Sequence, residues 1–201
     1  MAFLRFKDRT TSKTSDVSST RAHDEADVAR LVERAANGDV NSFGQLYDIY
    51  LSSIYRYVYY HVKDRMAAED LTHEIFIKAW EAIGKYEWRG QPFSSWLFRI
   101  ARNQTVDFYR AAKRDAKLKE RVSATISDPE IQVGEKVTGK ELIEAISCLP
   151  PQQKELIILK FIVGLDNQQI ASIMEKNPGA LRIMQMRALD ILNQKLGENK
   201  R

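Results

Sequence analysis

Apolar residues recur at three- and four-residue steps along most of the chain, which is the period of an amphipathic helix. The first stripe, residues 31–36, ends at Asn37-Gly38, a pair typical of a helix C-terminus. The pattern predicts further helices at 41–61, 65–83, 92–113, 141–149, 150–163, 167–175 and 178–196. No segment shows the strict alternation that is typical of a strand. The predicted fold class is therefore all-α.

Two breaks in the periodicity divide the chain. Residues 1–24 are rich in Ser and Thr and predict a disordered tail. Residues 114–138 lose the helical pattern and predict a flexible linker, because a connection of this length is unusual inside one compact domain. We therefore expect two small helical domains, an aromatic-rich bundle at 25–113 and a second domain at 139–201.

Composition excludes several classes of protein. A single cysteine, Cys148, rules out a disulfide framework within one chain and fits a reducing cytoplasm, where we expect the protein to act. No apolar run reaches the length of about 18 residues that a membrane span requires, so we expect no membrane insertion. Residues 89–121 hold nine basic and three acidic side chains, which favours a polyanionic partner such as nucleic acid.

Residues 166–189 predict a helix that Asp166 can cap, a tight turn, and a second helix that begins at Asn177-Pro178, a cap followed by a first-turn proline. This is the geometry of a helix-turn-helix, whose second helix can enter the major groove of DNA. The side chains that would then reach base edges or phosphates are Arg182, Gln185, Met186 and Arg187. The alternative is an ordinary helical hairpin that packs inside a bundle.

The helix predicted at 92–113 carries arginines at three- and four-residue spacing, as neutralisation of phosphates requires. The loop before it brings Tyr86, Trp88 and Arg89 beside this basic stripe. Aromatic and cationic side chains together are typical of sites that stack unpaired bases. The alternative is that the tryptophans belong to the core, and for Trp96 we prefer it because Phe93 and Ile100 share its helix face.

The helix predicted at 65–83 has an acidic edge formed by Glu69, Asp70 and Glu74, with Phe76 and Trp80 close by. An acidic edge beside aromatic side chains suits a docking surface for a protein partner. The alternative is a solvated helix face without a partner.

Catalytic and metal-binding patterns are missing. His73-Glu74 resembles half of a zinc-protease motif, but Ile77 stands where the second histidine is needed. There is no glycine-rich phosphate loop, and Cys148 has no histidine nearby in the sequence, so we expect a buried structural thiol. We therefore predict no enzyme activity, no metal and no cofactor.

Motifs in three parts of the chain, in order, resemble those of the extracytoplasmic-function (ECF) sigma factors of the sigma-70 family. AEDLTHEIFIKAW at 68–80 resembles the helix with which this family binds core RNA polymerase, and RGQPFSSWLFRIARN at 89–103 resembles the segment that follows it. LPPQQKEL at 149–156 and GALRIMQMRAL at 179–189 resemble the family's promoter-reading C-terminal domain. The resemblance covers about residues 25–112 and 138–196.

The resemblance implies a function for each domain. A sigma2-like domain would bind the polymerase and would read and melt the −10 element, and a sigma4-like domain would bind the −35 element as duplex. The implied partners are core RNA polymerase with its β′ and β subunits, promoter DNA as duplex and as melted strand, and an anti-sigma factor. The implied polymerase-binding residues are Asp70, Glu74 and Phe76. The implied −10 residues are Trp88, Arg89, Gln91, Arg99, Arg102 and Asn103, and the implied −35 residues are Arg182, Gln185, Met186 and Arg187.

Some positions depart from the family pattern. His73 stands where Gln is common, and Ile183, Met184 and Met186 stand where more polar residues are frequent. The alternative function is a stand-alone helix-turn-helix regulator that binds a palindromic duplex without polymerase. An interaction protein without a DNA role is a third hypothesis, against which the basic segment 89–121 argues.

Overall fold

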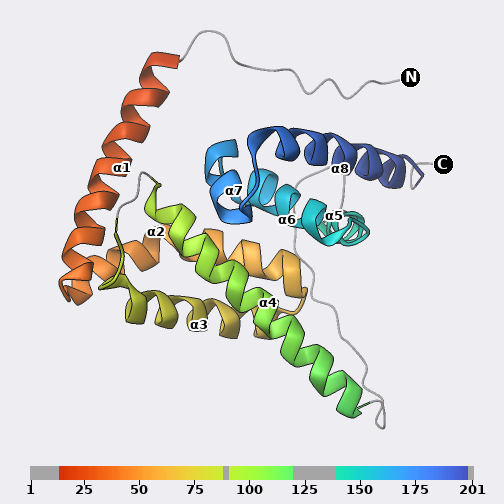
Figure 1. The fold of residues 1–201 in the computed structure, drawn as a ribbon, viewed down its shortest axis with the longest axis horizontal. Coiled ribbons are helices and arrows are strands. Elements are labelled where there is room, and N and C mark those ends of the chain that lie inside the picture. The colour runs from red at the N-terminus through yellow and green to blue at the C-terminus, as the bar shows by residue number, and fades with distance from the viewer. Residues whose placement is uncertain (1–13, 88–90, 120–138, 199–201) are drawn as a thin grey trace.

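The computed structural model describes residues 14–87, 91–119 and 139–198, and this part of the chain is helical with no strand (Figure 1). The all-α prediction is confirmed. None of the described helices combines the length and the apolar character that crossing a bilayer requires. The elements are α1 (Thr14–Ala36), α2 (Val40–Val62), α3 (Arg65–Ile83), α4 (Phe93–Lys119), α5 (Gly139–Ser147), α6 (Pro151–Ile157), the π-helix η1 (Ile158–Val163), α7 (Asn167–Met174) and α8 (Pro178–Glu198).

The first four helices form an N-terminal bundle in which α2 packs against α1, α3 and α4. Aspartates begin two of these helices. The Asp39 carboxylate accepts hydrogen bonds from the backbone N–H groups of Asn41 and Ser42 at 3.0 and 3.3 Å. The Asp64 carboxylate accepts one from Ala67 at 2.7 Å. Each cap satisfies backbone donors that the first turn of a helix leaves without partners.

Aromatic rings fill the seam between α2 and α3. Phe43 meets Trp80 edge-on with ring centroids 4.9 Å apart, and Tyr47 meets Phe76 at 4.6 Å. Edge and tilted arrangements at these distances are the favoured geometries of aromatic pairs. This seam fixes the position of α3, whose outer face is exposed.

The C-terminal helices contain a helix-turn-helix formed by α7 and α8. Asp166 begins α7 with a capping box, in which its carboxylate accepts from the Gln168 and Gln169 N–H groups at 2.8 Å and the Gln169 side chain accepts from the Asp166 N–H. Asn177 begins α8 by accepting from the Ala180 N–H at 2.7 Å. Between the two helices, Glu175 takes the left-handed conformation with φ of 54°. Both caps were predicted from the sequence.

The two domains pack against each other and share one continuous core cluster. In this interface η1 lies on α2, and α7 lies on α4 (Figure 1). Its centre is polar: the Tyr57 hydroxyl donates to Oε1 of the buried Glu155 at 2.8 Å. His61 Nε2 lies 3.2 Å from the other carboxylate oxygen, and Lys154 Nζ donates to the His61 carbonyl at 3.3 Å.

Two predicted boundaries differ from the structure. Helix α1 begins at Thr14, so it includes residues 14–24, which we expected in a disordered tail. Helix α4 continues to Lys119 and includes residues 114–119, which we expected in the linker. Once packed residues have nucleated a helix, its extension costs little, because each added residue gains a backbone hydrogen bond. Such an extension needs no apolar residues, so apolar periodicity does not detect it. The rest of the predicted tail and linker lies outside the described residues.

Candidate functional site

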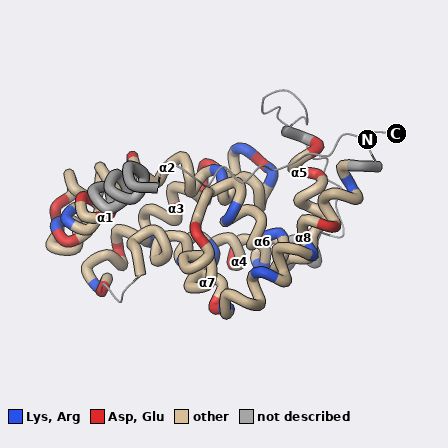
Figure 2. Tube along the Cα trace, turned by 90° about the horizontal axis from the view of Figure 1, so that it is seen from above, with Lys and Arg blue, Asp and Glu red and all other residues tan. Residues whose placement is uncertain are grey.

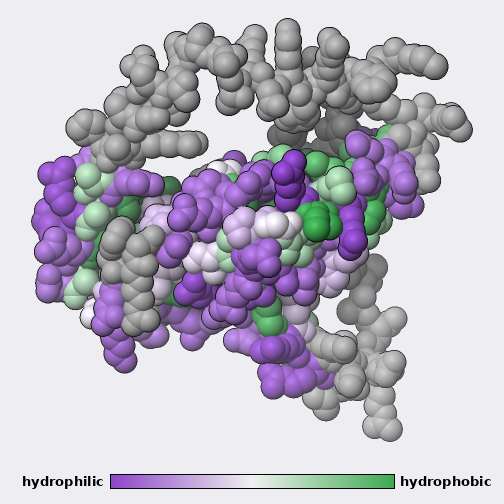
Figure 3. Space-filling model, turned by 45° about the horizontal axis from the view of Figure 1, so that its top comes forward, coloured by the Kyte–Doolittle hydropathy of each residue, from purple (hydrophilic) through white to green (hydrophobic). Residues whose placement is uncertain are grey.

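Four exposed side chains form one face of α8, directly after the turn of the helix-turn-helix. They are Arg182, Ile183, Met186 and Arg187, and their spacing of one, four and five residues places them side by side on the helix. The opposite face, with Leu181 and Ala188, is buried in the domain. Gln185 is half-buried at the edge of the exposed face. Hydrophobic side chains interrupt the hydrophilic surface over α8 (Figure 3).

The candidate −10 residues of α4 have different surroundings. The exposed Arg99 guanidinium donates to the Ser172 carbonyl at 3.1 Å and to its Oγ at 3.0 Å, so it contacts α7 of the helix-turn-helix. Arg102 is half-buried near Tyr57. Burial and the nearby Glu155 raise the pKa of Tyr57 well above its ordinary value, and the charge of Arg102 opposes this increase. Asn103 is exposed.

The loop before α4 is described only in part. Trp88 and Arg89 lie outside the described residues. Gln91 is half-buried, and its Oε1 has no hydrogen-bond partner among the residues that the structure describes. The Trp96 ring packs at 5.3 Å from both Tyr86 and Phe93, so the prediction that Trp96 belongs to the core side of the helix is confirmed.

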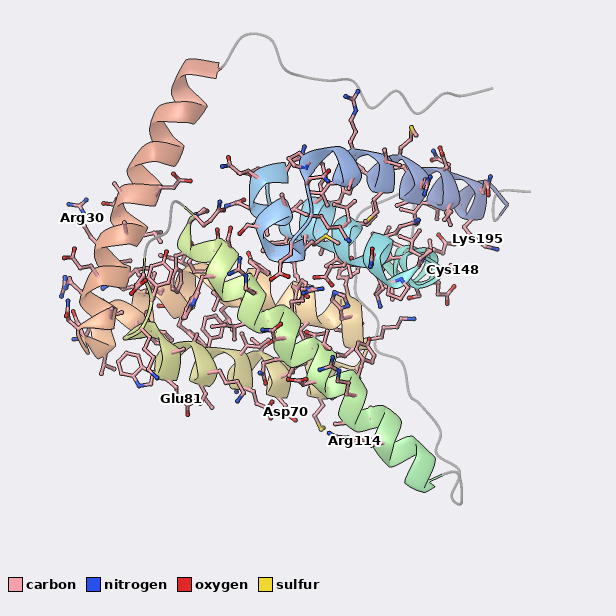
Figure 4. The ribbon with its side chains drawn as sticks, in the orientation of Figure 1. Arg30, Asp70, Glu81, Arg114, Cys148 and Lys195 are labelled. Carbon is pink, nitrogen blue, oxygen red and sulfur yellow. The ribbon has the colours of Figure 1, made fainter. Side chains whose placement is uncertain are left out.

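The acidic edge of α3 is a solvent-facing surface. Asp70 and Glu74 are exposed one turn apart. Asp70 and Glu81 project from α3 away from the C-terminal domain (Figure 4). Trp80, which the sequence analysis placed beside this edge, is 37% exposed, and sequence reasoning missed a second exposed apolar side chain on the same helix, Ile77 (58%). Ile77 could have been found from its spacing, because it lies three residues after Glu74 and seven after Asp70, on the same helix face.

Two expectations from the sequence are corrected here. Phe76 does not belong to the exposed edge of α3, because its side chain is 5% exposed and its ring packs on Tyr47. Cys148 is not a buried structural thiol, because it is exposed after the end of α5 (Figure 4).

The candidate surfaces lie apart from one another. Helix α3 and helix α8 are on opposite sides of the molecule, and the α4–α7 contact lies between them (Figure 1). Acidic and basic positions are scattered over both domains, so charge alone does not mark the surfaces (Figure 2). No group of three or more His, Cys, Asp or Glu residues in the described ranges is arranged to hold a metal ion.

Family models match both domains. Residues 46–115 match Sigma-70 region 2, and residues 139–192 match Sigma-70, region 4. Among solved structures, the sigma factor RpoE in complex with the anti-sigma factor NepR from Bartonella quintana has a TM-score of 0.69 at 24% identity. The match covers 79% of this chain and 98% of that chain, and at this identity it shows a shared fold.

Relatives match across both domains. The ECF RNA polymerase sigma factor BldN of Streptomyces coelicolor is 37% identical over 182 residues, which cover 89% of this chain and 69% of the relative. The ECF RNA polymerase sigma factor SigD of Mycobacterium tuberculosis is 30% identical over 175 residues, which cover 83% and 82%. Sigma factors are not enzymes, in agreement with the prediction from the sequence. The chain therefore belongs to the ECF sigma factors of the sigma-70 family, with region 2 in its N-terminal bundle and region 4 in its helix-turn-helix domain.

Proposed function

We propose that this protein binds core RNA polymerase and directs it to promoters by reading a −35 element with α8 and by reading and melting a −10 element with α4 and the loop before it. The observation that carries the proposal is the exposed face of α8, where Arg182 and Arg187 are exposed after the turn of a helix-turn-helix whose second helix is capped by Asn177. Such a helix presents its first turns to the major groove, and arginine is the side chain that most often reads guanine there.

The exposed face of α3 supports the polymerase contact. Asp70 and Glu74 offer negative charge one turn apart, and Ile77 adds an apolar side chain to the same face. The Phe43–Trp80 and Tyr47–Phe76 ring contacts hold α3 against α2, so this face is preformed. We assign it to the β′ subunit, because a rigid surface with mixed acidic and apolar character suits a partner helix pair with basic side chains.

The first half of α4 supports the contact with the −10 element. Asn103 and Arg99 expose polar groups to solvent, and Gln91 stands at the start of the helix next to the segment that carries Trp88 and Arg89. Melted DNA needs phosphate-binding cations and a surface on which a displaced base can stack or bond. We also propose regulation by an anti-sigma factor that covers one of these surfaces, as the family resemblance implies.

Run-off transcription tests the proposal. The purified protein and core RNA polymerase without another sigma factor are incubated with genomic fragments, and new start sites that require this protein are expected. Asp70→Lys and Glu74→Lys should each weaken binding to the core enzyme. Glu33→Lys, a charge reversal at an exposed site on α1, serves as the matched control and should bind normally.

The same assay distinguishes the proposed sigma function from the alternative, a stand-alone regulator. Tight binding to a palindromic duplex without polymerase, together with no transcription and no binding to the core enzyme, would identify a stand-alone regulator. Unchanged affinity for core polymerase in both α3 variants would remove α3 from the interface.

A further inference from the structure

Two large apolar side chains are exposed to solvent on the helix that we propose reads duplex DNA. Ile183 is 51% exposed and Met186 is 60% exposed. They lie three residues apart in the first turns of α8, on the same side of the helix, and the exposed Arg182 and Arg187 flank them in the sequence. The described part of the chain buries neither of them.

Their position indicates what could cover them. The Asn177 cap and the buried Leu181 fix the start of α8 on the domain, so the exposed face is rigid. Two arginines flank the apolar pair, and their charge favours a polyanion over an apolar protein surface. Duplex DNA is therefore the occupant that fits the charge of this face.

The chemistry of the major groove then indicates which group of the duplex these side chains would contact. Ile and Met side chains donate no hydrogen bond and do not read the donor and acceptor pattern of base edges. The apolar group that the major groove presents is the C5 methyl of thymine. Residues three apart in a helix differ by about 4.5 Å in height, close to the rise of about 3.4 Å between base pairs, so the two side chains can reach adjacent base pairs.

We propose that Ile183 and Met186 contact the C5 methyl groups of thymines in adjacent or nearly adjacent base pairs of the −35 element. This inference rests on the proposed function of α8 and adds its specificity for thymine. The arginines on either side would hold the helix on the duplex, while the apolar pair would select the base. The departure of these two positions from the polar residues frequent in the family would then change the preferred sequence.

Deoxyuridine substitution tests this proposal, because it removes only the methyl group and keeps the base pair. The holoenzyme formed from core polymerase and the full-length protein is first used to select −35 sequences from a randomised promoter library. Each thymine of the selected element is then replaced by deoxyuridine, and holoenzyme affinity is measured by competition. At one or two positions we expect a loss of about fourfold, which is the value of one buried methyl group.

Variants of the protein assign the loss to a side chain. In Ile183→Ala or Met186→Ala, the penalty for deoxyuridine should disappear at the position that the missing side chain contacts. Val40→Ala changes another exposed apolar residue, at the start of α2, and should keep the full penalty. Because the substituted residues are exposed, loss of folding is not expected, and circular dichroism checks it.

The outcomes distinguish this inference from the proposed function. If the selection yields no −35 preference and the holoenzyme does not protect this region, the function proposed for α8 fails. If a preference exists but deoxyuridine costs nothing, or costs the same in the alanine variants, contact with thymine methyls is refuted. If Ile183→Ala and Met186→Ala instead weaken assembly with core polymerase at unchanged DNA preference, the pair is a protein-docking surface and the proposal is overturned.

Discussion

Replacing Tyr57 by Phe tests whether the two domains meet in solution as they do in the structure. The substitution removes one oxygen and keeps the ring, which packs at 5.6 Å from Phe98 and at 4.7 Å from His61. The lost hydroxyl is the donor to the Glu155 carboxylate across the domain interface, at 2.8 Å. The effect on stability should therefore come from one hydrogen bond.

The expected cost follows from the burial of both partners. Tyr57 is fully buried and Glu155 is 8% exposed, so water does not replace the missing donor. A hydrogen bond to a charged group contributes about 1.5–3 kcal/mol, and a buried carboxylate left without its donor is costly. We therefore expect Tyr57→Phe to lower the free energy of unfolding by about 2 kcal/mol. Glu155→Met, which removes the acceptor at similar length, should cost a similar amount.

A double-mutant cycle with urea unfolding, followed by circular dichroism at pH 7, measures the contact itself. The double variant should be less destabilised than the sum of the single variants, with a coupling of about 1–2 kcal/mol, since neither partner is then left alone. Tyr60→Phe removes the hydroxyl of another tyrosine of α2, which makes no hydrogen bond to the described residues and is not among their buried unpaired polar atoms, and should change stability by less than about 0.5 kcal/mol. Additive effects of the two substitutions would refute the reasoning, because they would mean that Tyr57 and Glu155 do not meet.

Two further predictions concern single residues. Burial, with the charge of Lys63, lowers the pKa of Lys154 from 10.5 to about 8, so the folded protein holds this proton less tightly than the unfolded chain, and stability should rise from pH 8 to pH 10. Lys154→Met should flatten this rise in urea titrations, and a rise of equal size in both proteins would contradict the assignment. Glu175 has a φ of 54° at the turn before α8, so Glu175→Gly should raise the free energy of unfolding by about 0.5–1 kcal/mol in thermal unfolding. A loss of stability would show that the glutamate side chain stabilises the turn.

Local patterns in the sequence were sufficient to predict the helices and most of their ends. The capping box at Asp166 and the cap at Asn177 depend on residues within three positions of each other, so the sequence shows them directly. The helix-turn-helix followed from these two signals and the apolar spacing between them. The boundaries that differed, at Thr14 and Lys119, lie where helices extend beyond the packed residues.

Contacts between distant segments could not be predicted from these patterns. The spacing of α3 places Phe76 at the border between its buried and exposed faces, and only the Tyr47 ring on α2 decides that it is buried. In the same way, the sequence predicts Arg99 as a phosphate ligand, whereas the structure pairs it with Ser172, 73 positions away. Periodicity assigns a residue to a face of its own helix and does not identify the element that covers that face.

The packing of the two domains has a consequence for the proposed function. Elements at −10 and −35 are separated by about 25 base pairs, or about 85 Å of duplex, whereas a compact chain of this length has a radius of gyration of about 17 Å. Helices α4 and α8 therefore cannot reach both elements while Arg99 and Ser94 are bonded to Ser172 and Gln169 of α7. Under the proposed function, promoter binding on the polymerase therefore requires these contacts and the Tyr57–Glu155 bond to break. The coupling measured in the double-mutant cycle would then be one part of the free energy that binding to the polymerase supplies to separate the domains.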